Sequence, residues 1–314
     1  MHQHIKPNFL LAYPVMLSML GQVMTGVADS VMVGWMGAVP LAASSFANVF
    51  FNVLLFFGVG VSYALTPLVA QAEGANESSK IIAVLKNGIL INLLTGFALV
   101  LLIFGIEPFM HYMGQPEEVV TLALPYLSII ALSIIPTMIF QTYRQFAEGL
   151  QRTRAAMIIV VGSNLLNIAL NYVLIFGHYG FPELGLNGAG WATLIARVAM
   201  AISMMAYVYF GRRYQPYRSG FSVGGYSAKL ISKMLHIGIP AGSQFIFEAG
   251  AFGFSAIMMG WIGTTALAAH QIAINLATIS YMTTSGLGAA ATIRVGNFLG
   301  QKNKKNLRAS AFAM

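Results

Sequence analysis

Long apolar runs separated by short polar joints form the dominant pattern along this chain. A helix that crosses a membrane needs about 20 mostly apolar residues. Eight runs reach that length, and they predict the spans Phe9–Trp35, Pro40–Ala70, Ile81–Ile106, Val119–Tyr143, Ala155–Phe176, Gly188–Phe210, Leu230–Ile262 and Ala266–Gly296. A ninth span is expected to begin near Leu307, just before the chain ends at Met314. Proline favours kinks in helices, and five prolines lie inside these spans: Pro14, Pro67, Pro125, Pro136 and Pro240.

The composition agrees with a membrane protein and excludes a soluble one. Hydrophobic residues make up 57% of the chain and charged residues only 8%, whereas an ordinary soluble domain carries roughly 25% charged residues. We therefore predict an all-α polytopic membrane protein. The chain contains no cysteine, which excludes disulfides, thiolate metal sites and cysteine nucleophiles.

The basic residues are distributed unevenly over the joints. All but one of the 17 lysines and arginines lie in the N-terminal tail or in alternate joints, namely Lys6, Lys80, Lys86, Arg144, Arg152, Arg154, Arg212, Arg213, Arg218, Lys229, Lys233, Arg294, Lys302, Lys304, Lys305 and Arg308. The positive-inside rule predicts a cytoplasmic N-terminus and a multi-pass position in the plasma membrane, which is the inner membrane of a Gram-negative cell. The formal net charge of +8 thus follows from topology, and nucleic acid is not expected as a partner.

Arg197 is the exception, because it lies inside the sixth predicted span. A charge at that depth costs roughly a few kcal/mol. One interpretation is a long side chain that points into a wet cavity or towards the membrane surface. The other is a role in the path of a substrate, and the sequence leaves both open.

An internal repeat relates residues 14–74 to residues 240–300 at a constant offset of 226. The Gly-Trp-x-Gly of residues 34–37 recurs at 260–263 in the corresponding joint. The offset contains six predicted spans, an even number, so both copies cross the membrane in the same direction. Parallel repeats of this kind commonly enclose a substrate path between two lobes.

The repeat predicts how the domains are organised. The first six spans form an N-terminal lobe at residues 1–220, and residues 221–314 begin a second lobe with two spans and a stub. Two complete lobes would contain twelve helices. We therefore interpret the chain as C-terminally truncated.

Two acidic residues lie within the predicted spans, Asp29 in the first and Glu248 in the seventh. An ionisable group inside the membrane is costly and by default indicates function. Such a carboxyl group can exchange a proton for a metal ion or a cationic drug, and a structural hydrogen-bonded acid is the alternative. Through the repeat, Glu248 corresponds to Gln22 and Asp29 to Ser255, which places one acid in each lobe, roughly 10 Å apart in depth.

A row of amide side chains lies in the fifth predicted span. Asn164, Asn167 and Asn171 are spaced i, i+3 and i+7, so they share one helix face. Amides on one face can hold helices together, or they can offer carbonyl oxygens to a hard cation such as Na⁺. The spacing alone favours neither of these two roles. Nearby spans add further polar residues, which are Thr193, His270 and Gln271.

These segments resemble the multidrug and toxic compound extrusion (MATE) family and its NorM-like branch. The resemblance extends over nearly the whole chain and rests on VADSVMVGWMG around Asp29, GVGVSYALTPLVAQAEGA (58–75), NIALNYVLIFG (167–177), FPELGLNGAGWAT (181–193), IPAGSQFIFEAGAF (239–252) and AAHQIAINLATISYM with AAATIRVGNFLG (268–300). It implies a two-lobed antiporter of twelve helices. Such a protein exports cationic, lipophilic drugs and dyes in exchange for Na⁺ or H⁺, within the lipid bilayer and without another cofactor.

The resemblance also implies roles for individual residues. Asp29 matches the cation-linked acid of the first lobe, and Glu248 matches the second-lobe acid of the NorM-like branch. The polar neighbours expected around a Na⁺ or a substrate are Asn167, Asn171, Thr193 and Gln271. The third acid of that branch would lie on a later helix, beyond the chain end. We expect a monomer.

Three other functions are less well supported by the residues. A lipid-linked oligosaccharide flippase of the same superfamily would need several basic residues around its anionic carrier, and only Arg197 is offered. An intramembrane enzyme would need a nucleophile and base or metal ligands. His270 is the only histidine clearly associated with a span, and there is no cysteine, so no enzyme is predicted. A receptor that transports nothing receives no support from the repeat.

Overall fold

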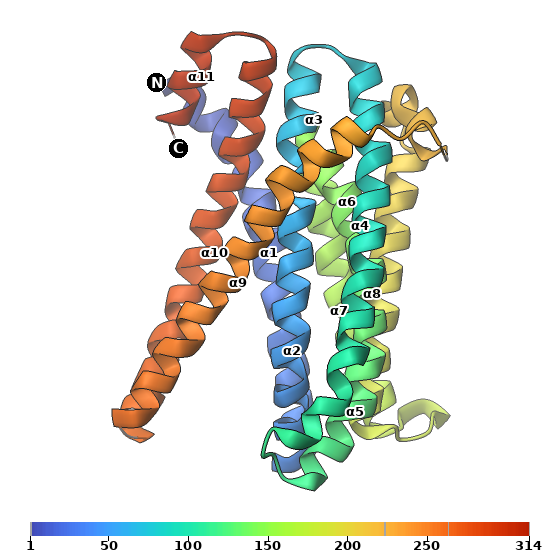
Figure 1. The fold of residues 1–314 in the computed structure, drawn as a ribbon, viewed down its shortest axis with the longest axis vertical. Helices are drawn as coiled ribbons and strands as arrows, with labels where there is room; N and C mark the ends of the chain where they lie inside the picture. Colours follow the sequence, from blue (N-terminus) through green and yellow to red (C-terminus); the bar gives the residue numbers. More distant parts are fainter. Residues whose placement is uncertain (1, 223, 263, 314) are drawn as a thin grey trace.

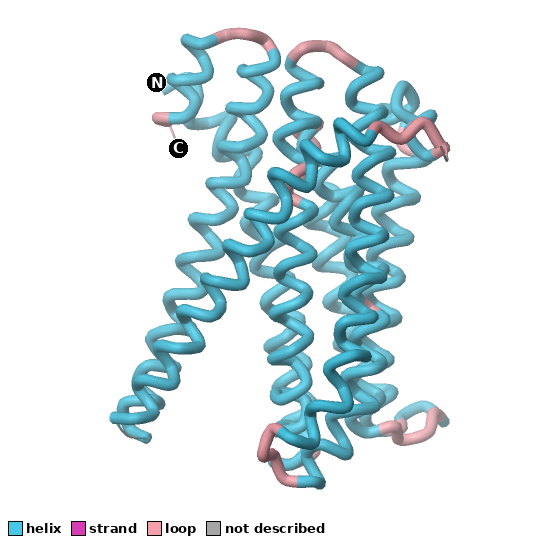
Figure 2. The backbone as a smooth tube through the Cα atoms, in the orientation of Figure 1, coloured by secondary structure: helices cyan, strands magenta, loops and turns pink. Residues whose placement is uncertain are grey.

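The computed structural model describes residues 2–222, 224–262 and 264–313, and most of them are helical, as Figure 1 and Figure 2 show. Its helices in chain order are α1 (His2–Gly34), α2 (Ala38–Ser62), α3 (Leu65–Gly74), α4 (Ser78–Ile106), η1 (Glu107–Tyr112), α5 (Glu117–Leu132), α6 (Ile134–Gly149), α7 (Arg154–Phe176), η2 (His178–Gly180), α8 (Gly185–Phe210), η3 (Arg212–Phe221), α9 (Ala228–Ile262), α10 (Thr264–Gly300) and α11 (Lys304–Ala311).

The predicted spans correspond to these helices. Among the described residues, six helical segments are long and apolar enough to cross a membrane. These segments are Lys6–Gly34, Ala38–Gly74, Ser78–Tyr112, Glu117–Gly149, Arg154–Phe176 and Gly185–Phe210. The seventh and eighth predicted spans are helices α9 and α10, of 35 and 37 residues. Parts of α9 and α10 lie outside the residues whose side chains are described, so their apolar character rests on the sequence.

Two predicted spans are divided rather than continuous. The second is split between α2 and α3, and the fourth between α5 and α6. Helix α2 stops near Tyr63 and helix α5 stops at Leu132. These positions lie four residues before Pro67 and Pro136. Because proline has no N–H, it cannot donate the helical hydrogen bond to the carbonyl four residues earlier. The other helices remain unbroken through Pro14, Pro125 and Pro240.

Helix α6 corrects the predicted position of Arg144, which was expected in a joint. It continues to Gly149, beyond the expected end at Tyr143, so Arg144 and Glu148 lie in the helix and not in a joint. Both are almost fully buried, with 1% and 2% of their surface exposed. Arg144 Nε donates to Glu148 Oε1 at 2.7 Å. The pair can be buried because each charge compensates the other one helical turn away.

The internal repeat is visible in the helix boundaries. Helix α10 runs from Thr264 to Gly300, and the pair of α2 and α3 runs from Ala38 to Gly74, which is the same interval displaced by 226 residues. Helix α11 begins at Lys304, 226 residues after α4 begins. The expected ninth span therefore has a helical start at the position that the repeat requires.

The two repeats meet at one end of the molecule. The connections at 75–77, 150–153 and 211–222 lie at this end, which we call the basic end because the joints rich in lysine and arginine gather there. Figure 1 shows α9 and α10 crossing the first lobe near the basic end and leaning away from α1 and α2 towards the opposite end. The lobes are thus closed at the basic end and divergent at the other.

Glycines allow this close approach. A Cβ on Gly60 would lie 2.4 Å from Cα of Gly242, and a Cβ on Gly286 would lie 2.9 Å from Cα of Met16. Gly286 is the repeat equivalent of Gly60, and Gly242 that of Met16, so the contacts are related by a pseudo-twofold axis. A second pair of contacts obeys the same relation. A Cβ on Gly74 would lie 1.9 Å from the carbonyl oxygen of Asn297, and a Cβ on Gly300 would lie 2.0 Å from the carbonyl oxygen of Gln71.

The connection between the lobes is attached to the first one. The ring of Phe221, at the end of η3, stacks on Tyr143 of α6 at 5.5 Å. The hydroxyl of Tyr217 donates to Glu73 Oε2 at 3.1 Å. Burial and the negative charge of Glu73 raise the pKa of Tyr217, which keeps this hydroxyl protonated as the donor. Residues 212–221 therefore pack as part of the first lobe.

Candidate functional site

Three helices of the first lobe converge on the carboxylate of Asp29. Asp29 lies on α1 and is half-buried. Its Oδ1 accepts a hydrogen bond from Asn171 Nδ2 of α7 at 2.6 Å, and its Oδ2 accepts one from Thr193 Oγ1 of α8 at 3.2 Å. The 3.6-residue period of each helix turns these polar groups inwards while the apolar residues face outwards.

The amide row on α7 serves two different contacts. Asn167 and Asn171 are fully buried, and Asn167 Nδ2 lies 3.4 Å from Thr193 Oγ1, so both belong to the Asp29 cluster. Asn164 instead binds α1 directly. Its Nδ2 donates to the carbonyl of Gly21 at 2.6 Å, and its Oδ1 accepts from the hydroxyl of Thr25. Asn164 thus holds two helices together, while Asn167 and Asn171 lie beside the Asp29 carboxylate, where binding of a cation stays a prediction.

The oxygens of this cluster suit a hard monovalent cation. The carboxylate of Asp29, the hydroxyl of Thr193 and the amide oxygens of Asn167 and Asn171 are the ligand types that such ions prefer. Asn171 Oδ1 is buried without a hydrogen-bond partner. A buried carbonyl left in this way is costly unless something binds it. Within the described residues, no group of three His, Cys, Asp or Glu side chains gathers to hold a metal ion.

Arg197 lies one helical turn beyond Thr193 on α8 and points into the lobe. Its Nη1 donates to Ser133 Oγ at 2.8 Å, and its guanidinium carbon lies 4.8 Å from the centre of the Phe51 ring. Its positive charge acts on Asp29 electrostatically. Among the described residues, however, Asp29 takes part in none of the ion pairs. Sequence reasoning identified Arg197 as unusual but did not connect it with Asp29.

Glu248 occupies a separate position in the second repeat. It lies on α9, and its Oε2 accepts a hydrogen bond from the hydroxyl of Tyr281 on α10 at 2.9 Å. Tyr281 was not singled out from the sequence, since a lone tyrosine in an apolar helix gives no signal. His270 has a buried Nε2 without a partner. The side chain of Gln271 lies outside the described residues.

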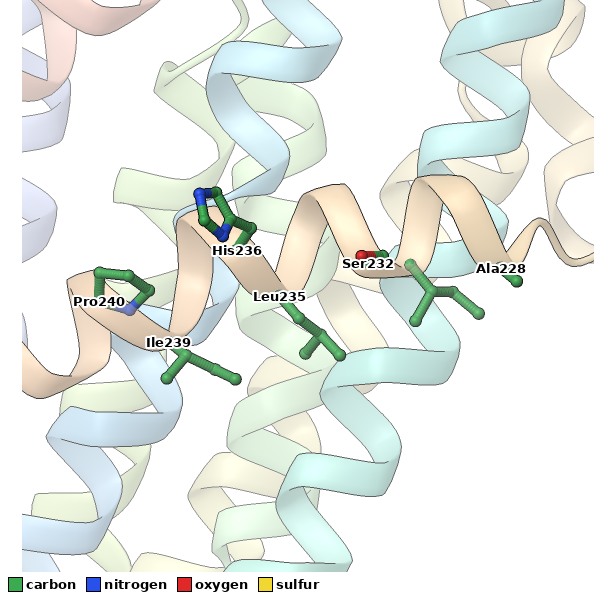
Figure 3. A pocket seen from close by; sticks show the side chains of 7 residues that line it. Ala228, Ser232, Leu235, His236, Ile239 and Pro240 are labelled. Atoms are coloured by element: carbon green, nitrogen blue, oxygen red, sulfur yellow. The ribbon is translucent and has the colours of Figure 1, made fainter.

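A cavity lies against the first half of α9, away from the predicted site residues. Its volume is about 580 Å³, and Figure 3 shows that Leu235 and Ile239 lie on one side of the helix and His236 on the other. The residues that line it are mostly apolar. It offers no cluster of charged groups comparable to the one around Asp29.

Fold and site together define a class of protein. Parallel helical repeats that cross the membrane, with an acid held among amides inside one lobe, are features of secondary transporters. Two segments of the chain, residues 14–173 and 240–314, match the family model described as MatE. The chain belongs to this family. Membership in a family of transporters also supports the prediction that the protein is not an enzyme.

Relatives with sequence similarity carry the name NorM. A probable multidrug resistance protein NorM of Rhizobium meliloti (strain 1021) is 34% identical over 99% of this chain and 67% of its own length. The one of Synechocystis sp. is 33% identical over 96% of this chain and 65% of its own length. The multidrug resistance protein NorM of Vibrio cholerae serotype O1 is 31% identical over 96% of this chain and 66% of its own length. The chain thus spans 65 to 67% of the length of these relatives.

Solved structures share the fold. A eukaryotic MATE transporter superposes with a TM-score of 0.87 at 23% identity, over 99% of this chain and 69% of that one. The outward-facing conformation of a multidrug resistance MATE family transporter gives 0.87 at 21% identity, over 98% of this chain and 68% of that one. These likenesses confirm the all-α, two-lobed membrane fold that the sequence predicts.

Proposed function

We propose that the protein is a secondary active multidrug efflux antiporter, which exports cationic, lipophilic compounds in exchange for Na⁺ or H⁺. One observation carries the exchange: the carboxylate of Asp29 is held inside the membrane by Asn171 and Thr193, with no ion pair among the described residues. The names of the NorM relatives support the class of substrate.

The chemistry of the Asp29 cluster supports exchange in the following way. The negative charge of a carboxylate at this depth is either removed by a bound proton or compensated by a cation bound to the surrounding oxygens. A lipophilic drug cation offers the same charge, so drug and coupling ion compete for the negative group. Because Glu248 lies in the other repeat beside Tyr281, it provides a second carboxylate for this competition.

The contact between the lobes supports alternating access. The glycine contacts close the basic end, and the lobes diverge at the opposite end. The distribution of lysine and arginine favours a cytoplasmic basic end in the plasma membrane, with the N-terminus on that side. In that orientation the arrangement is outward-facing, and transport by a monomer requires one lobe to rock against the other.

Efflux of the cationic dye ethidium from cells that express the protein tests the proposal. We expect Asp29→Asn to abolish dye efflux and its dependence on Na⁺ or pH, because the amide cannot exchange a cation. Glu248→Gln should reduce efflux strongly for the same reason. Glu118→Gln serves as a control, since Glu118 is exposed at the start of α5.

The outcome that contradicts the proposal is near-normal, ion-dependent efflux in both variants of the buried acids. Expression in the membrane is measured for each variant, so that loss of protein is distinguished from loss of transport. Proteoliposomes with an imposed Na⁺ gradient and then an imposed pH gradient determine which ion drives the exchange.

A further inference from the structure

A second cavity lies at the basic end, outside the Asp29 cluster. Its volume is about 320 Å³, and it is formed where α1, α7, α8 and η3 meet the α6–α7 connection. Arg152, Arg154 and Arg213 line one part of it, and Leu10 and Tyr207 line another. No Asp or Glu is among the described residues that line the cavity. It therefore combines a concentrated positive charge with an apolar wall.

One of the three arginines is held by contacts within the protein, and the other two are exposed. Arg152 Nη1 donates to the carbonyl of Arg213 at 2.9 Å, and its guanidinium lies 4.6 Å from the centre of the Tyr214 ring. The side chains of Arg154 and Arg213 are exposed. The acid nearest in the chain, Glu148, is already paired with Arg144. An anion entering the cavity would relieve the repulsion among three like charges.

The start of α7 adds backbone donors to these side chains. Thr153 precedes the 23-residue helix and does not cap its N–H groups through its side chain. The first N–H groups of a helix have no partner within the helix, and the helix dipole makes this end positive. A phosphate group is therefore a suitable occupant, with the arginines on one side and the helix end on the other.

An apolar face continues directly below the cavity along α7. Arg154, Ile158, Val161 and Leu165 are spaced i, i+4, i+7 and i+11, so they lie on one face of the helix. All four are exposed. Beside them at the cavity itself, Leu10 of α1 is also exposed. The surface thus changes from strongly basic to apolar within one helical turn, as a ligand with a charged head and a hydrocarbon chain requires.

We infer that this cavity binds the phosphate of an anionic phospholipid from the surrounding membrane, with its acyl chains along the exposed face of α7. Basic pockets between membrane helices on the cytoplasmic side bind such head groups. The inference does not depend on cation exchange at Asp29, because the two sites share no residue. It assigns a lipid partner to the first lobe.

Native mass spectrometry of the purified protein tests the site with phosphatidylglycerol and phosphatidylcholine of identical acyl chains. We expect phosphatidylglycerol to remain bound where phosphatidylcholine is lost. Arg154→Gln and Arg213→Gln should each lower the bound fraction about fivefold. These variants leave Arg152 and its contacts in place, so the fold is retained. Arg212→Gln is the matched control, because Arg212 is the exposed neighbour of Arg213 but does not line the cavity.

Three results would overturn the inference. Equal retention of the two lipids would show that no anionic head group is selected. An equal loss with Arg212→Gln would indicate a diffuse basic surface in place of a site. Displacement of the lipid by inorganic phosphate or glycerophosphoglycerol at a comparable concentration would identify a site for soluble phosphates, without a role for the acyl chains.

Discussion

Asp29 and Arg197 carry opposite charges inside the same lobe without forming a direct ion pair. Arg197 is held by Ser133 and by the ring of Phe51, while Asp29 is held by Asn171 and Thr193. The arginine therefore acts on the Asp29 carboxylate through space and forms no direct ion pair with it. If Asp29 exchanges a cation as proposed, a positive charge nearby lowers the affinity for that cation without occupying the carboxylate oxygens.

Removal of the Arg197 charge should therefore strengthen cation binding. We expect Arg197→Gln to lower the half-saturating Na⁺ concentration of dye efflux about tenfold. A tenfold change corresponds to roughly one pK unit of electrostatic repulsion between Arg197 and the bound cation. Arg197→Lys keeps the charge and should remain close to the parent protein. Titration of Na⁺ against initial efflux rates measures the effect, and an unchanged half-saturation in Arg197→Gln would contradict it.

At the scale of single elements, helix α6 is unusual in how it carries charge. It follows a proline-associated break and then buries an ion pair between Arg144 and Glu148 one turn apart. Arg144 Nη2 has no partner, so the arginine is only partly compensated. Removal of the carboxylate alone would leave an uncompensated charge in the core, which is among the most costly changes in a protein interior.

Glu148→Leu should accordingly destabilise the protein by about 3–5 kcal/mol. The double variant Arg144→Met with Glu148→Leu should recover most of this loss, because no charge then remains buried. Thermal unfolding followed by circular dichroism measures the difference. Glu77→Gln is the control, since it removes an exposed ion pair with Lys80 that contributes less than about 1 kcal/mol. Equal stability of Glu148→Leu and the parent would refute the prediction.

At the scale of the whole molecule, the two lobes are joined by contacts that repeat with the sequence. Two of the close glycine contacts between the lobes, Gly60 on Gly242 and Gly74 on Asn297, have counterparts 226 residues away. By contrast, an added Cβ on Gly26 of α1 or on Gly250 of α9 would meet nothing within 4 Å. The lobes thus share a tight seal at one end, where glycines allow the two backbones to approach each other.

A larger side chain at this seal should open the basic end. The chain has no cysteine, so Ala70→Cys places a single reporter where Ala70 packs 3.1 Å from the Cβ position of Gly296. We expect this cysteine to react slowly with a water-soluble maleimide, and severalfold faster when Gly74→Val is added. Gly26→Val is the matched control and should leave the labelling rate unchanged. The same slow labelling with Gly74→Val would show that the seal lies elsewhere.

The sequence by itself determined the class, the spans and the repeat. Hydrophobic runs of sufficient length can only be membrane helices in a chain with 8% charged residues. The constant offset fixed the equivalence of α1 and α9 before any contact was known. Asp29 and its amide neighbours were found because polar groups inside such runs are rare and costly. The domain boundary at 220, the coupling ion and the roles of the site residues stay predictions, the latter for Asp29, Glu248, Asn167, Asn171, Thr193 and Gln271.

The tertiary structure decided which polar groups meet. Spacing placed Asn164 and Asn171 on one face, but only the packing of α1 against α7 assigned the first to Gly21 and the second to Asp29. The burial of Arg144 was likewise invisible, since a charge next to a joint is usually solvated. Periodicity specifies the face of a helix that turns inwards. The partner of that face depends on how distant helices pack, which no local pattern encodes.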